Sequence, residues 1–513
     1  MIRTANDVKL KVLPVFTIAE HLYYYEGPCR FGTGESLEPG YDAMAAAQRE
    51  KFVMDLLPTL LPANVELMPV ARLHRTDDWD NHEAMWDAIE ESVNNCDVVF
   101  AATGIPNDDL IIEFATRFKK PIIISPDSYA AYTTIPAAVR AMSGIQPEMF
   151  PCWRWEKVTE ILASLRARKA IQRMNVLLVT RFGDTTSYSS GASFNSYEKI
   201  TNKLGVHFRF INCHELFDQM TPAVEGGNPT TPGRKTLDLT DEDLAEANRI
   251  TDELIAGAVD VSIDREMILK SVIAYVTVRK NMDDKDCCAF AAPCPDLCST
   301  RRLNQMQFTF CLTHSLNLEQ GCPSCCEFDV NSAVSMQALI AVSGKCPYMG
   351  NTEPLTMMDG FPIVLGGSAE QGKKLLELGT DNLYFMQHST PHRRIHDEKA
   401  DAPYAIRNFA IDQGFGATMR YNFDADQGRD ITLCRFSPDG ERMLISRAES
   451  VLGDGYEGIN CGEVVYFRVK DVDRFFDVQT YFGNHLVMVY GDYVKQLEDL
   501  CKLLDVEPVV IDR

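Results

Sequence analysis

Two acids in front of a helical pattern are the first residues of this sequence whose types and spacing could do chemistry. In GCPSCCEFDVNSAVSMQALIAVSG, residues 321–344, Glu327 and Asp329 follow a group of cysteines and precede an apolar run that ends at Gly344. The run predicts a buried helix, so both carboxylates stand where the loss of water is costly. Either acid could cap this helix, because a negative charge before the first turn complements the helix dipole. The alternative is that one of them binds a cation.

Further candidate ligands stand at the ends of other predicted elements. KCPYMGNTEP predicts a short strand with Asn351 and Glu353, which point to one side because they are two residues apart in an extended chain. His388 follows a strand-like run in LYFMQHSTPH, and His485 begins a buried strand in FGNHLVMVYG. A mixed oxygen and nitrogen ligand set suits Mn²⁺, Mg²⁺ or a similar cation that keeps exchangeable positions open. The candidate set consists of Glu327, Glu353, His388 and His485.

Each of these residues also has a plainer interpretation. A lone histidine beside a buried strand is more often a hydrogen-bonded core residue than a ligand. His392 and His396, in HRRIHDEK, are expected to be solvated loop residues, because Pro391 and the flanking charges argue against a regular buried element. Spacing alone therefore does not establish a metal site.

The cysteines offer a different metal site. Nine of the sixteen fall within sixty residues, and Cys322 and Cys325 form a CxxC pair, the usual half of a zinc or iron–sulfur site. No second CxxC stands at the spacing of a zinc ribbon, and other cysteines lie in apolar stretches such as CCAFAAPC, residues 287–294. Free cysteine is usually buried in such contexts. We therefore favour buried structural thiols and keep a cysteine-ligated zinc or iron–sulfur protein as an alternative.

The elements that must position these residues follow two patterns. Over the first 174 residues strand-like and helix-like segments alternate, which predicts an α/β domain with a parallel sheet covered by helices. NVLLVTRFG opens a second α/β unit at residue 175, and from about residue 351 the pattern becomes β-rich. We therefore predict domains at 1–174, at 175–350 with Glu327, and at 351–513 with His388 and His485. The turn-rich stretch 223–238 is expected to be a surface loop.

Composition restricts the partners of the chain. Its 513 residues are 45% apolar and 24% charged, as in a globular protein that buries large cores. Fifty basic and 73 acidic residues give a net charge of −23, which disfavours nucleic acid and anionic membranes as partners. We find no secretory signal pattern and no apolar run of about 18 residues, and expect a cytoplasmic protein with reduced thiols and no membrane span. Complete phosphate-loop and GxSxG motifs are also missing.

Two segments carry a resemblance to a known family. The stretch from CPDLC through FCLTHSLNLEQGCPSCCEFDVNSAVSMQALIAVSGKCPYMGN resembles the L-fucose isomerases. The C-terminal GNHLVMVYGDYVKQLEDLCKLLDVEPVVID resembles the ends of both L-fucose and L-arabinose isomerases, and PVFTIAEHLYYYEG is similar to the arabinose isomerase opening. The resemblance implies two Rossmann-like N-terminal domains with parallel sheets, followed by a β-barrel-containing C-terminal domain.

The same resemblance implies an activity and a cofactor. The expected reaction is aldose–ketose isomerisation of a pentose or 6-deoxyhexose, such as L-fucose, D-arabinose or L-arabinose, through a cis-enediolate. The expected cofactor is Mn²⁺ or another divalent cation such as Mg²⁺ or Co²⁺. Glu327 would be a metal ligand and a catalytic carboxylate, and His485 a metal ligand. An arabinose-isomerase-like alignment makes Glu353 the second catalytic and ligating glutamate and His388 the first histidine ligand.

The chain departs from the family at one position. L-fucose isomerases carry an Asp where this chain has Asn351, and asparagine cannot act as a base. Asn351 and Asn484 are therefore expected to bind substrate. A homologue that binds sugar without turning it over remains an alternative. The resemblance also implies a homo-oligomer, a trimer or hexamer.

Overall fold

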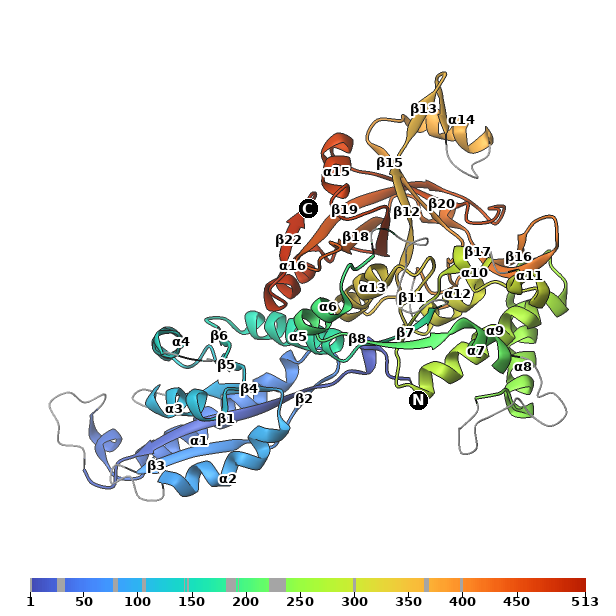
Figure 1. Cartoon of the computed structure of the whole chain (residues 1–513). Helices are drawn as coiled ribbons and strands as arrows, with labels where there is room; N and C mark the ends of the chain where they lie inside the picture. The colour runs from blue at the N-terminus through green and yellow to red at the C-terminus, as the bar shows by residue number, and fades with distance from the viewer. Residues whose placement is uncertain are drawn as a thin grey trace. The chain divides into compact units, whose positions relative to one another are not determined.

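The computed structural model describes residues 2–24, 33–76, 82–103, 108–142, 144, 147–180, 191, 193–220, 237–298, 301–363, 369–396 and 400–513 (Figure 1). The chain divides into two units, Val8–Arg166 and Met1–Asp7 with Ala167–Arg513. The three domains expected from the sequence stay a prediction. Except for its last two residues, the loop expected at 223–238 lies outside the described residues.

The unit Val8–Arg166 is built on one parallel sheet, as predicted. Its strands pair in the order β2-β1-β4-β5-β6 with β3 also beside β1, and each of these pairings is parallel. The apolar stretch 65–73 forms two strands, because Pro69 has no N–H for a continuous ladder. The strands are β1 Leu10–Glu20, β2 Val65–Leu67, β3 Ala71–Thr76, β4 Val98–Ala102, β5 Ile122–Ile124 and β6 Met149–Pro151. The helices are α1 Tyr41–Leu56, α2 His82–Asn95, α3 Asp108–Phe118, α4 Ala131–Ala141 and α5 Trp155–Gln172, whose last residues belong to the larger unit.

A second parallel sheet lies in the larger unit. Its order is β11-β10-β7-β8, and the strands are β7 Asn175–Thr180, β8 His207–Asn212, β10 Ala289–Ala291 and β11 Ser324–Cys325. Ligands in such sheets bind beyond the carboxyl ends of the strands. Glu327 stands two residues beyond the carboxyl end of β11, so this edge is the first place to look for a site.

Six antiparallel strands of the larger unit close into a barrel. They pair in the order β18-β21-β12-β15-β20-β19, and β19 returns to β18. The barrel strands are β12 Tyr348–Pro354, β15 Leu383–His388, β18 Asp430–Phe436, β19 Arg442–Gly453, β20 Glu463–Arg468 and β21 His485–Tyr490, and β22 Glu507–Val510 pairs with β19 outside the ring. With the two parallel sheets, the barrel confirms the predicted fold class (Figure 1).

Helix α13, Val330–Ser343, connects the second sheet to the barrel. Residues 330–341 are all buried, which explains why the helix has no separate polar face. It packs against β18 and β21, and the Asn331 side chain donates through Nδ2 to the Phe436 carbonyl of β18 at 2.8 Å. Asp329 caps the helix and Gly344 ends it at φ +73°, as the sequence predicts.

The remaining elements complete the two units. The Thr240 side chain and Asp243 form a capping box at the start of α8. Among the described residues, no helix combines the length and the apolar character that crossing a membrane requires. The other helices are α6 Tyr197–Leu204, α7 Cys213–Gln219, α8 Asp241–Gly257, α9 Arg265–Asp284, α10 Cys294–Cys298, α11 Arg302–Met306, α12 Cys311–Glu319, α14 Ala369–Leu378, α15 Val472–Gln479 and α16 Val494–Leu503. The other strands are β9 Asp260–Val261, β13 Thr356–Met358, β14 Phe361–Ile363, β16 Tyr404–Ala410 and β17 Phe415–Tyr421, and the 3₁₀ turns are Ala5–Asp7, Gly34–Leu37, Leu57–Leu60 and Phe423–Asp426.

Strand β12 needs a glycine where it meets β15. A Cβ on Gly350 would lie 2.6 Å from Met386 Cγ and 2.7 Å from the Gln387 carbonyl oxygen. Because part of this contact is backbone, the strands would have to separate. We expect Gly350→Ala to lower the free energy of unfolding by about 1–3 kcal/mol, measured by urea denaturation. Gly191→Ala is the control, since its Cβ would meet nothing within 4 Å, and equal stability of the two variants would contradict the close approach.

Candidate metal centre

Three of the four predicted ligands come together at one place in the larger unit. Glu327 follows β11, His388 ends β15 and His485 begins β21. Asn351 of β12 pairs in register with both Gln387 and His485, which puts the two histidines at the same level of the barrel. Glu327 Oε1 lies 3.8 Å from His388 Nε2, and Glu327 Oε2 lies 3.5 Å from His485 Nε2. One ligand atom from each of the three lies within 4.8 Å of the other two.

The two imidazole nitrogens that face Glu327 have no hydrogen-bond partner. His388 Nε2 and His485 Nε2 are both buried and unpaired, and both rings are fully buried. A buried polar atom without a partner costs about 1–3 kcal/mol. A divalent cation bound to one carboxylate and two neutral imidazoles would satisfy both nitrogens, so the residues present fit a metal ion of the Mn²⁺ class.

His485 is held in place by Asp329. Asp329 Oδ2 lies 2.8 Å from His485 Nδ1, and the Ser332 amide donates to Asp329 Oδ1 at 3.2 Å. Asp329 therefore caps α13 and orients the histidine at the same time. An ionised carboxylate only accepts hydrogen bonds, so His485 Nδ1 carries the proton and the Nε2 lone pair faces Glu327. Such a carboxylate–histidine pair commonly supports a metal ligand.

Arg435 of β18 keeps Asp329 ionised. Its Nη1 and Nη2 donate to the two carboxylate oxygens at 2.7 and 3.2 Å. Arg435 and Asp329 are both fully buried. Burial alone would raise the pKa of Asp329, but the Arg435 guanidinium and the contact with His485 hold that pKa far below its usual range. Nη1 also donates to the His485 carbonyl at 2.7 Å, which ties the start of β21 to the same ion pair.

His388 is a neutral ring in this environment. Burial, followed by the proximity of His485, lowers the pKa of His388 to about 3. The Ser389 amide donates to His388 Nδ1 at 2.9 Å, so the neutral ring carries its proton on Nε2. Binding a cation at Nε2 therefore requires the ring to move its proton to Nδ1 and to give up this amide contact.

The backbone at Glu327 is strained. Glu327 and Phe328 have φ angles of +57° and +56°, in the left-handed region that residues with a Cβ rarely adopt. Two hydrogen bonds maintain the turn, from the Phe328 amide to Ala292 O at 3.0 Å and from the Asp329 amide to Cys326 O at 3.1 Å. Strain of this kind gathers at functional sites. The turn leaves the Glu327 side chain about a quarter exposed (24%), and burial raises the pKa of its carboxyl.

The other predicted site residues lie on β12 and at the start of β21. Glu353 is exposed and lies outside the three-ligand group. Because side chains alternate along a strand, Glu353 shares a face with Asn351, whose register partner is His485. The Asn484 side chain donates through Nδ2 to Asn351 Oδ1 at 2.6 Å, so these two asparagines form one polar pair beside the metal group. The roles expected for all three stay predictions.

Sequence reasoning missed Arg435 and misplaced His392. Arg435 lies in DITLCRF, where an arginine between Cys434 and Phe436 of a mostly buried strand was the available signal for a buried ion pair. His392 was expected to be solvated, and that prediction was wrong: the ring is fully buried and its Nε2 lies 3.1 Å from the Pro347 carbonyl oxygen. The flanking charge of Arg393 is directed to Glu319 instead, which leaves the histidine inside.

The cysteines are free thiols in the part of the chain that the structure describes, and most of them are buried. The CxxC pair belongs to no group of three close metal-ligating side chains among the described residues, and Arg279 donates to Cys322 Sγ at 3.1 Å. Other thiols line a cavity of about 210 Å³ whose wall also contains Glu327 and Ser389. The candidate metal group therefore borders a small cavity rich in sulfur.

Comparison with known proteins gives two distant relatives. No family model matches the chain. The chain is similar to the sulfoquinovose isomerases of Priestia aryabhattai and Priestia megaterium, with 21% identity over 358 residues in each case. The aligned part covers 68% of this chain and 68% of each relative.

Proposed function

We propose that this protein is a metal-dependent sugar isomerase that interconverts an aldose and a ketose. The observation that carries the proposal is the group of Glu327, His388 and His485, with two buried imidazole nitrogens that face the carboxylate and lack any partner. The two relatives, both named sulfoquinovose isomerase, support a sugar isomerase activity in general. The barrel and the parallel sheets agree with the fold implied by the L-fucose isomerase resemblance.

The three residues would hold Mn²⁺, or Mg²⁺ or Co²⁺ in its place. When bound, such an ion polarises a carbonyl and stabilises negative charge on neighbouring sugar oxygens. Glu327 supplies two oxygens to the site, because Oε1 faces His388 and Oε2 faces His485. His485 is the pre-oriented ligand, since Asp329 and Arg435 fix its ring and its backbone. His388 is the ligand that adapts on binding.

Glu327 is also the proposed base for the carbon proton. Isomerisation moves a proton between C1 and C2, and a carboxylate within hydrogen-bond reach can carry it. In the metal-free protein, burial raises the pKa of the Glu327 carboxyl. Its partial exposure leaves room for a substrate to approach.

The second proton carrier is proposed to be Glu353. It shares a face of the barrel sheet with Asn351 and His485 and lies outside the three-ligand group. We expect Glu353→Gln to lower kcat by about 10²-fold, the lower end of the range for acid–base groups, and to leave Mn²⁺ affinity unchanged. Steady-state kinetics and a Mn²⁺ titration would measure the two effects. An unchanged kcat would remove Glu353 from the reaction.

The substrate is proposed from two sources. The resemblance favours a pentose or a 6-deoxyhexose, and the relatives add sulfoquinovose. The deciding assay is ketose formation from L-fucose, D-arabinose, L-arabinose and sulfoquinovose with Mn²⁺. We expect turnover of at least one of them, loss of turnover after chelation, and recovery when Mn²⁺ is restored. No turnover of any aldose together with no proton exchange at C2 would contradict the proposal.

The proposed trimer or hexamer can be checked by light scattering.

A further inference from the structure

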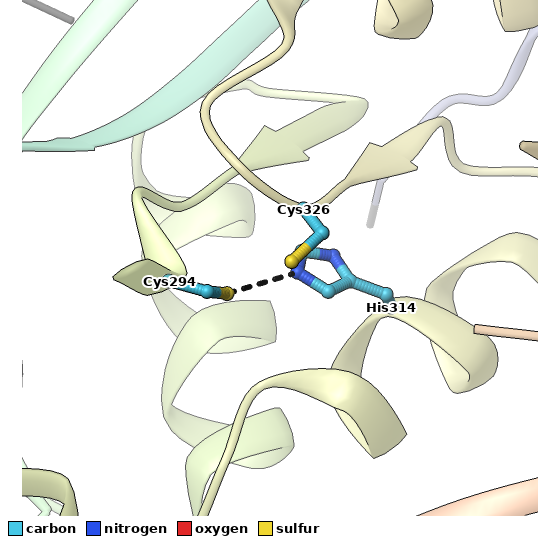
Figure 2. Close-up of side chains that lie close together, drawn as sticks. All are labelled: Cys294, His314 and Cys326. Atoms are coloured by element: carbon cyan, nitrogen blue, oxygen red, sulfur yellow. Dashed lines mark hydrogen bonds between the residues drawn. The ribbon is translucent and has the colours of Figure 1, made fainter. Parts of the chain in front are cut away.

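A second group of metal-ligating side chains lies beside Glu327 and has no part in the proposed reaction. Cys294, His314 and Cys326 each direct one ligand atom into a common space, and these three atoms lie within 4.8 Å of one another (Figure 2). Cys294 Sγ is 4.0 Å from His314 Nε2. Cys294 begins α10 shortly after β10, His314 lies on α12, and Cys326 directly follows β11.

The fold brings the two cysteines together for a simple reason. β10 and β11 are neighbouring parallel strands, and Ala291 of β10 pairs with Cys325 of β11. Cys294 stands three residues beyond the end of β10, and Cys326 stands directly beyond the end of β11. Both thiols therefore emerge at the carboxyl edge of the sheet, where such folds bind ligands.

His314 is positioned as a metal ligand would be. It is fully buried on α12, and its Nδ1 lies 2.9 Å from Ser324 Oγ of β11. When Nδ1 donates to this hydroxyl, the Nε2 lone pair faces the two sulfurs. A second hydrogen-bonding partner of this kind fixes the tautomer and orientation of ligating histidines. Asn317 donates to the same hydroxyl at 3.3 Å and holds it in place.

The distances are close to those of a tetrahedral zinc centre. Zn–S bonds of about 2.3 Å and Zn–N bonds of about 2.0–2.1 Å place sulfur and nitrogen ligands roughly 3.6 Å apart. The 4.0 Å between Cys294 and His314 is slightly longer, so a small inward movement would complete the site. Cys294 and Cys326 also line the cavity of about 210 Å³, which provides an entry path and space for a fourth ligand.

We propose that Cys294, His314 and Cys326 form a zinc site with its fourth position open to the cavity that Glu327 also lines. Two thiolates and one imidazole favour Zn²⁺ over Mn²⁺ or Mg²⁺, whereas Glu327 and its two histidines favour the harder cations. The chain thus places a soft-metal site and a hard-metal site side by side, joined at the consecutive residues Cys326 and Glu327. The zinc site stands independently of the isomerase proposal, because it uses none of the same side chains.

The experiment is a Co²⁺ titration of the reduced, metal-free protein. Cobalt replaces zinc at such sites, and only thiolate ligands give it a strong charge-transfer band in the near ultraviolet. With the neighbouring site filled by saturating Mg²⁺, we expect the band to saturate at one equivalent per chain. It should lose at least half its intensity in Cys294→Ser and in Cys326→Ser, and all of it in the double variant. Cys298→Ser is the matched control, because Cys298 lines the same cavity but lies outside the group, and it should keep the full band.

Two further measurements separate this site from its neighbour. Glu327→Gln should keep the thiolate band, even though it removes a ligand of the proposed Mn²⁺ site. If the cysteine variants do not fold, X-ray absorption of the cobalt-loaded wild-type protein decides, and we expect two sulfur ligands in the first shell. The proposal is overturned by the absence of a thiolate band, by an equal loss in Cys298→Ser, or by a shell of oxygen and nitrogen alone.

Discussion

Replacing Glu327 with glutamine is expected to lower kcat/KM by at least about 10³-fold, within the range that acid–base groups contribute and with the loss of a charged ligand added. Glutamine keeps the shape of the side chain but cannot accept the carbon proton, and it offers the cation a neutral oxygen. Steady-state kinetics with saturating Mn²⁺ would measure the effect on the most active sugar of the panel.

The fold should survive this change. The turn at Glu327 is maintained by hydrogen bonds of the backbone amides that follow it, not by its side chain. We therefore expect a free energy of unfolding within about 0.5 kcal/mol of the wild type, as for most substitutions of partly exposed residues. Glu253→Gln is the control, since Glu253 is exposed on α8 far from the site in sequence. A rate for Glu327→Gln that matches this control would remove Glu327 from the reaction.

The largest effect on stability is expected at Asp329. Asp329→Asn leaves the Arg435 guanidinium buried without a counter-charge, and breaking a buried pair in this way costs about 3–5 kcal/mol. The variant should also lose activity, because asparagine can turn its NH₂ group toward His485 and so no longer fixes the tautomer of the ring. Urea denaturation followed by circular dichroism would measure the free energy of unfolding.

The pH dependence of the stability difference between the wild type and Asp329→Asn follows from the direction in which the fold shifts the pKa of Asp329. The pKa of Asp329 is depressed in the folded state, so its contribution is fully present above the unfolded value of about 3.9. The contribution is lost as the pH falls through the folded pKa. The gap between wild type and Asp329→Asn should therefore stay constant between about pH 5 and pH 8 and close only in strong acid.

A double variant tests whether the unpaired charge of Arg435 causes the loss of stability in Asp329→Asn. Asp329→Asn combined with Arg435→Met removes both charges, and the double variant should be more stable than Asp329→Asn alone, because no uncompensated charge remains. Ser332→Ala is the milder comparison, since it removes the Ser332 hydroxyl bonds to Asp329 and Arg435 and leaves the ion pair. If Asp329→Asn lowers the free energy of unfolding by less than about 1 kcal/mol, which is no more than an ordinary hydrogen bond contributes, the predicted role of the buried ion pair is wrong.

Local signals predicted much of what surrounds the site. Asp329 and Gly344 mark the two ends of α13 because capping depends on residues only a few positions away. The alternation of parallel strands and helices and the β-rich C-terminal part were also readable, since both follow from periodicity. Glu327, His388 and His485 were selected because ligands stand at the ends of buried elements.

Long-range contacts account for what sequence reasoning could not supply. The partner of Asp329 is Arg435, which lies 106 positions further along the chain. Nothing near Arg435 in the sequence indicates that pairing. Cys294 and Cys326 meet only because β10 and β11 are neighbours, a fact of sheet order rather than of spacing. Glu353 is exposed where β12 still pairs with β15 but has passed the residues that pair with β21, a difference that depends on strand register and not on local sequence.

The central claim is that one divalent cation binds between Glu327, His388 and His485. A crystal structure of the full-length protein with Mn²⁺, with anomalous data collected at the manganese edge, tests it most directly. We predict one strong peak with the Glu327 carboxylate and both Nε2 atoms at roughly 2.0–2.3 Å, the range for cations of this size. A peak bound by other side chains, or no peak at saturating Mn²⁺, would contradict the account.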